Sequence, residues 1–225
     1  MNGFTLPWSA LVLPTLEVQQ LLHTAAWVAV LTWCSVRLLA SVWGASAWLI
    51  CSSAWVLLLA WWSAPLSALG LAFQSPSLLT LCLCVMAAWA DLQKPERQLF
   101  SSPPQVQATT VVWAVLVLLG WCLMLDTWGQ LPTDIYLWGF ERPALWWAWG
   151  LVGGWMLWAT VQENLTATWH GRAATCGLAA IALFVVTRAP SGNVWDALID
   201  PGLWLYAHVQ LWRAWGPQRT RINHS

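Results

Sequence analysis

The chain has 225 residues, of which 59% are hydrophobic and only 8% are charged. Nine basic residues balance nine acidic ones, so the sequence excludes the strongly basic surface that nucleic-acid binding requires. Twenty-three residues are tryptophan, whose apolar ring and single N–H donor suit the boundary between a membrane and water. This composition predicts an all-α integral membrane protein embedded in the lipid bilayer.

Residues 1–17 are predicted to form an interfacial segment that lies on the membrane surface. Pro7 and Pro14 interrupt the apolar stretch, which leaves pieces too short to span a bilayer. The segment lacks the basic flank and the small-residue cleavage site of a secretory signal. Trp8 is expected at the depth of the lipid headgroups.

Residues 18–216 are predicted to form a bundle of about seven transmembrane helices. A span needs about 20 mostly apolar residues, and seven candidate runs occur, at residues 18–39, 46–62, 76–90, 107–125, 143–161, 172–186 and 201–215. Asp200 and Pro201 indicate where the last helix begins, as its N-cap and first-turn proline. The third, sixth and seventh runs contain only about 15 residues, or about 22 Å of helix. A six-helix alternative places residues 195–215 on the membrane surface.

The basic residues predict the orientation of this bundle. Seven spans place seven basic residues on one side of the membrane and two on the other. The first group is Arg37, Lys94, Arg97, Arg172, Arg213, Arg219 and Arg221, and the second is Arg142 and Arg188. Basic residues are retained on the cytoplasmic side, so the N-terminus is expected outside and residues 217–225 form a cytoplasmic tail.

Two histidines within the predicted spans are candidate cofactor ligands. His208 shares one helical face with Trp204 and Trp212, and His23 lies at a compatible depth in the first span. Ionisable groups at membrane depth are rare and often functional. The sequence requires no cofactor, but a haem or a chlorophyll-type pigment bound by these histidines is one hypothesis. The other is that His208 forms hydrogen bonds with a neighbouring helix.

A stripe of tryptophans runs along the second predicted span. Trp48, Trp55 and Trp62 are spaced seven residues apart. Trp55 lies near mid-membrane, where its N–H must find a partner in the protein or in a bound molecule. The stripe therefore indicates either a packing seam between helices or a surface that contacts a flat apolar cofactor, a lipid or a partner protein.

Small residues predict a tight hairpin between the fifth and sixth spans. Gly150 and Gly154 form the four-residue pattern that allows close approach of two helices. Ala173, Gly177 and Ala180 form a smooth strip on the next span. Because a short loop joins the two spans, we expect these two sets of residues to contact each other.

The sequence contains no pattern that is specific for catalysis. Hydrolytic and metal-binding motifs are absent, and Asp196 and Asp200 are expected to form a solvated acidic rim. Together with thin loops, this favours a non-catalytic subunit or assembly factor of a complex in the bacterial inner membrane, bound to a membrane-protein partner or to a second copy of itself. A small permease and, third, a membrane-embedded enzyme that modifies lipids or glycans are the alternatives.

Overall fold

A computed structural model describes residues 13–43, 46–61, 75–92, 106–162 and 169–215, and these residues form helices and the turns between them. The seven long helices are α1 (Leu16–Trp43), α2 (Ser46–Trp61), α4 (Leu78–Leu92), α5 (Val106–Thr127), α7 (Arg142–Gln162), α8 (Trp169–Thr187) and α10 (Pro201–Trp215). Two short helices, α6 (Ile135–Trp138) and α9 (Val194–Leu198), lie in the connections before α7 and before α10. The predicted all-α architecture is confirmed for this part of the chain.

Each of the seven segments predicted from hydropathy is a helix, with ends that differ from the prediction by only a few residues. Among the described residues, two helices are long and apolar enough to cross a membrane, at Leu16–Leu38 and Thr110–Thr127, and shorter apolar helices occur at Ala47–Leu59, Leu78–Ala90 and Gly171–Thr187. The start of α10 was predicted correctly, because the Asp200 side chain accepts a hydrogen bond from the Leu203 backbone N–H at 2.8 Å. Trp62, residues 1–12 and residues 217–225 lie outside the described part.

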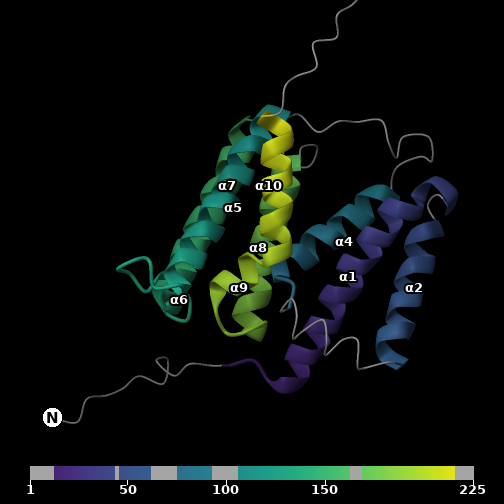
Figure 1. The fold of residues 1–225 in the computed structure, drawn as a ribbon, viewed down its shortest axis with the longest axis horizontal. Helices are drawn as coiled ribbons and strands as arrows, with labels where there is room; N and C mark the ends of the chain where they lie inside the picture. The colour runs from purple at the N-terminus through teal and green to yellow at the C-terminus, as the bar shows by residue number, and fades with distance from the viewer. Residues whose placement is uncertain (1–12, 44–45, 62–74, 93–105, 163–168, 216–225) are drawn as a thin grey trace, which may run out of the picture.

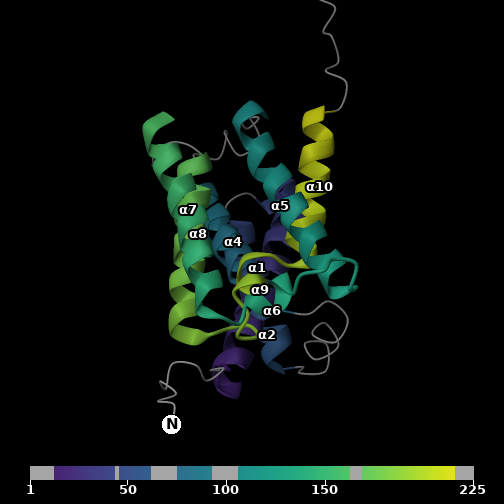
Figure 2. The same ribbon diagram turned by 90° about the vertical axis from the view of Figure 1, so that its left-hand side faces the viewer.

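The long helices are arranged as a row of five and a separate pair. In the row, α2 packs on α1, α1 on α4, α4 on α8 and α8 on α7. The pair consists of α5 and α10, which pack on each other. Figure 1 shows α1, α2 and α4 inclined away from the other long helices. In the turned view of Figure 2, α7 and α8 lie on one side and α5 and α10 on the other.

The largest buried cluster lies where α4, α7, α8 and α9 meet. Ile181 and Phe184 of α8 are almost completely buried there, together with Ala144 and Ala148 of α7. The outward surfaces are also apolar: Leu38 is 80% exposed and Val186 is 83% exposed. Several tryptophans are exposed as well, among them Trp146, Trp147, Trp212 and Trp215.

The α7–α8 hairpin forms, but with a different face of α7 from the predicted one. Ala173, Gly177 and Ala180 of α8 are buried, and a Cβ atom at Gly177 would lie 2.8 Å from Cγ1 of Val152. A Cβ atom at Gly150 or Gly154 would meet no described atom within 4 Å. Ala148 and Val152 therefore take the place that the sequence suggested for the two glycines.

This geometry predicts opposite outcomes for two leucine substitutions. Gly177→Leu should destabilise the protein by roughly 2–3 kcal/mol, because the added side chain must displace Val152 from a buried contact. Gly154→Leu should change stability by no more than about 0.5 kcal/mol, since its surroundings are open. Thermal unfolding in mild detergent measures both variants. Equal losses for the two would mean that the assigned face of α7 is wrong.

Candidate functional site

His208 lies in the contact between α10 and α5, where both of its ring nitrogens have partners. The Trp121 indole N–H donates to Nε2 at 3.1 Å. An indole nitrogen can only donate, so Nε2 must be the acceptor and Nδ1 must carry the proton. Nδ1 lies 2.9 Å from the backbone oxygen of Trp204, to which it donates. The ring is thus held in one tautomer by two neighbouring groups.

The other proposed cofactor residues do not assemble around His208 as a single site. Trp204 packs edge-to-face on the His208 ring with centroids 4.6 Å apart, but Trp212 is 75% exposed. His23 contacts Trp27 on its own helix, with ring centroids 6.5 Å apart. If His208 were one of two axial ligands of a haem iron, it would have to give up one of its two hydrogen bonds.

Trp55 has a partner in the protein. Its indole N–H donates to the Ser35 hydroxyl of α1 at 3.0 Å, and Trp48 is buried in the cluster between α1 and α2. The described part of the tryptophan stripe therefore packs between these two helices, as the first of the two interpretations predicts.

The hydrogen-bonded ring predicts the effect of replacing His208. His208→Gln should lose about 1 kcal/mol of stability, because the amide can keep only part of the two bonds. His208→Leu should lose about 2 kcal/mol, because both bonds disappear. The visible absorption spectrum of the purified protein should be the same for both variants as for the wild type. A band at about 400 nm that disappears in His208→Gln would instead identify a bound pigment.

Asp200 ties the start of α10 to the start of α4. One carboxylate oxygen accepts hydrogen bonds from the Ser77 backbone N–H at 2.9 Å and from the Thr80 hydroxyl at 2.5 Å. The other oxygen caps α10 through Leu203. Asp200 is only 9% exposed, so the expectation that it belongs to a solvated acidic rim was wrong.

Asp196 is also more sheltered than expected and belongs to a junction between α6 and α9. Its carboxylate accepts hydrogen bonds from the Tyr136 hydroxyl at 2.9 Å and from the Ser191 hydroxyl at 2.5 Å. Burial raises the pKa of the Asp196 carboxyl, although both hydrogen bonds act in the opposite direction. Burial and the nearby Asp196 carboxylate raise the pKa of the Tyr136 phenol to about 12.

The raised pKa of Asp196 makes its contribution to stability depend on pH. Folding favours the protonated carboxyl, so the contribution is complete below the ordinary pKa of 3.8 and falls as the pH rises through the raised value. The melting temperature of Asp196→Asn relative to wild type should therefore rise with pH. If the difference in melting temperature between the two proteins did not change with pH, Asp196 would be solvated.

Sequence reasoning missed two glycines that are required by close contacts in this region. Asn193 is fully buried, caps α9 by accepting from the Trp195 N–H at 2.9 Å, and donates to the Tyr136 backbone oxygen at 2.9 Å. Gly139 lies so close to Asn193 that a Cβ atom there would overlap its side chain. Gly120 of α5 lies equally close to the Trp204 ring. Neither glycine is part of a recognisable motif, so the sequence alone gives no signal.

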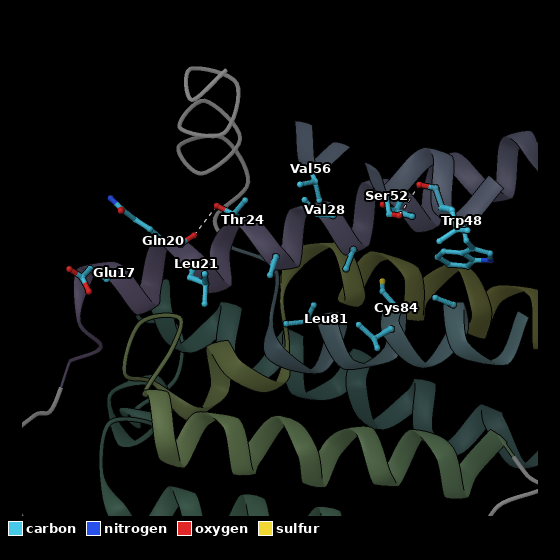
Figure 3. Close-up of a pocket in the computed structure, with 16 residues that line it drawn as sticks. Glu17, Gln20, Leu21, Thr24, Val28, Trp48, Ser52, Val56, Leu81 and Cys84 are labelled. Atoms are coloured by element: carbon cyan, nitrogen blue, oxygen red, sulfur yellow. Dashed lines mark hydrogen bonds between the residues drawn. The ribbon is translucent and has the colours of Figure 1, made fainter. Parts of the chain in front are cut away.

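A groove runs between α1, α2 and α4 and has a volume of about 850 Å³. Figure 3 shows Glu17 and Gln20 at one end of the groove, Trp48 at the other, and apolar side chains such as Val28 and Leu81 between them. The hydroxyls of Thr24 and Ser52 bond to backbone oxygens of their own helices, Gln20 and Leu49. The groove thus presents a mostly apolar surface.

Thr32 is the exception within the groove. Its side chain is 3% exposed and lines the groove, yet its hydroxyl has no hydrogen-bond partner among the described residues. A threonine in a helix ordinarily bonds to the backbone oxygen four residues earlier. The groove therefore contains one buried polar group whose bonding capacity is unused by the described part of the chain.

Within the described residues, no group of three or more His, Cys, Asp or Glu side chains is arranged to hold a metal ion. The chain matches no protein-family model, no curated protein sequence and no solved structure.

Proposed function

We propose that the chain is a polytopic protein of the bacterial inner membrane with seven spans, its N-terminus outside and its C-terminus in the cytoplasm. The apolar outer faces of the helices support a lipid environment, since soluble proteins rarely expose so much contiguous apolar surface. The arrangement of connections supports the threading. Residues 76–77, 135–139 and 193–200, all assigned to the outer side, meet at one end of the bundle.

Within that membrane, we propose that the protein acts as a non-catalytic subunit or assembly factor. His208 within α10 and Asp200 at its outer end are the polar groups best placed for chemistry, and both are held by hydrogen bonds to a neighbouring helix and to the backbone of α10. A general base or a metal ligand needs an acceptor that is free to react. These side chains instead stabilise the bundle.

The observation that carries this proposal is the groove between α1, α2 and α4, which is suited to one transmembrane helix of a partner protein. Helix contacts in membranes are rich in small residues, because these let two backbones approach closely. Ala25 and Ala29 of α1 have this four-residue spacing and both line the groove, as do Ser52 of α2 and Ala88 of α4. A polar side chain on the incoming helix would satisfy the Thr32 hydroxyl.

Photo-crosslinking from inside the groove tests this assignment. A benzophenone amino acid replaces Val28, and as a matched control Val186, which is 83% exposed on α8. In membranes of the native host, position 28 should give one discrete adduct with a membrane protein, identified by mass spectrometry, and position 186 should not. The same adducts at both positions, or adducts with lipid alone at position 28, would exclude a partner helix.

A further inference from the structure

A second cavity lies between the α5–α10 pair and the row of five helices. It has a volume of about 550 Å³, within the range of about 300–1,000 Å³ that is typical of ligand sites. Its lining comes from α1, α4, α5 and α10, and includes Trp27, Leu83, Met86, Ala87 and Leu205. The cavity and the groove between α1, α2 and α4 use different faces of α1, and Cys84 of α4 lines both.

Three aromatic rings line one end of this cavity. Tyr206 of α10 lies edge-to-face against Trp33 of α1, with centroids 5.8 Å apart, and against Trp113 of α5, with centroids 5.6 Å apart. The guanidinium carbon of Arg37 lies 5.7 Å from the Trp33 ring centroid, one helical turn beyond it. Arg37 itself lines the cavity. This end of the cavity is therefore aromatic and positively charged.

Two side chains of opposite charge, Asp200 and Arg37, line the cavity. Asp200 lines the cavity from the first turn of α10, about 9 Å of helix away from Tyr206. Its carboxylate repels an anion, whereas the guanidinium of Arg37 attracts one. An anionic group would therefore lie at the Arg37 end, with the apolar body of the molecule extending towards Asp200.

The length of the cavity matches one leaflet of a bilayer. Its lining on α1 runs from Trp27 to Arg37, which is about 15 Å of helix and half of the hydrocarbon thickness of about 30 Å. We propose that this cavity holds an acyl chain of an anionic phospholipid from the cytoplasmic leaflet, with the phosphate bound at Arg37. The assignment to that leaflet rests on the proposed topology, which places Arg37 on the cytoplasmic side.

Native mass spectrometry of the full-length protein in mild detergent tests this proposal with defined lipids. The probes are dioleoyl phosphatidylglycerol, dioleoyl phosphatidylcholine, which has the same chains without net charge, and oleic acid. Wild-type protein should retain at least about tenfold more of the first than of the second. Arg37→Gln should reduce phosphatidylglycerol binding to the phosphatidylcholine level, and Arg172→Gln, on the same predicted side but away from the cavity, should leave it unchanged.

A second pair of variants keeps the test independent of the charge change. Ala87→Phe fills the cavity and should abolish retention of the lipid, whereas Ala54→Phe, on an exposed position of α2, should not. Equal retention of both phospholipids, full binding by Arg37→Gln, or displacement of phosphatidylglycerol by equimolar oleic acid would overturn the proposal. A failed crosslink at Val28 would remove the partner helix but not this site, since the two lie on different faces of α1.

Discussion

Replacing Asp200 with alanine is expected to destabilise the protein by roughly 3–5 kcal/mol. The carboxylate accepts three hydrogen bonds, and its loss leaves the buried Ser77 N–H without an acceptor, breaks the bond from the Thr80 hydroxyl and leaves α10 without a cap. For a chain of this size the melting temperature should fall by roughly 10 °C. Thermal unfolding followed by circular dichroism in detergent measures the change.

Asp200→Ser separates the two roles of this side chain. A serine can still cap α10 at Leu203, but it is too short to reach α4. We expect this variant to lie between wild type and Asp200→Ala. If Asp200→Ala lowers the free energy of unfolding by no more than about 0.5 kcal/mol, the hydrogen bonds between α4 and α10 do not stabilise the protein and Asp200 is not buried.

Gly139→Ala is expected to cost roughly 3 kcal/mol, although it adds a single methyl group. The added carbon would overlap the Asn193 side chain and the Trp195 ring. Asn193 cannot move without breaking its bonds to the Trp195 N–H and the Tyr136 carbonyl, and it is fully buried. The junction between α6 and α9 should therefore open in this variant.

Gly153→Ala is the matched control for this change. A Cβ atom at Gly153 would meet no described atom within 4 Å, and alanine is favoured over glycine inside a helix by about 0.5–1 kcal/mol. This variant should be slightly more stable than wild type in the same unfolding experiment. If Gly139→Ala matched it, the α6–α9 junction would not be formed as described.

The seven long helices could be predicted from the sequence because each coincides with a mostly apolar run, whereas the short helices α6 and α9 were not predicted. The N-cap and proline at Asp200–Pro201 fixed the start of α10 by local chemistry alone. The burial of Asp200 could not be predicted, since its partners Ser77 and Thr80 lie 123 and 120 residues away in the chain. Hydropathy locates a helix but does not pair its polar side chains.

The rotation of α7 was the other feature that the sequence left open. Ala144 and Ala148 have the same four-residue spacing as Gly150 and Gly154, and two residues correspond to about 200° around a helix. The small-residue pattern therefore fits two opposite faces. Burial of Ala144 and Ala148 in the cluster with residues of α8 and α9 decides between them, and leaves the two glycines on the opposite face of α7.

Cysteine accessibility in cells tests the central claim, a seven-span bundle with its N-terminus outside, most directly. Thr133 is exposed in the connection between α5 and α6, and Arg172 is exposed near the start of α8. In intact cells with a permeable outer membrane, a membrane-impermeant maleimide should label Thr133→Cys, and it should label Arg172→Cys only after lysis. The wild type, with its six cysteines, gives the background level of maleimide labelling. Labelling of Arg172→Cys from outside, or protection of Thr133→Cys, would contradict the topology and the function proposed from it.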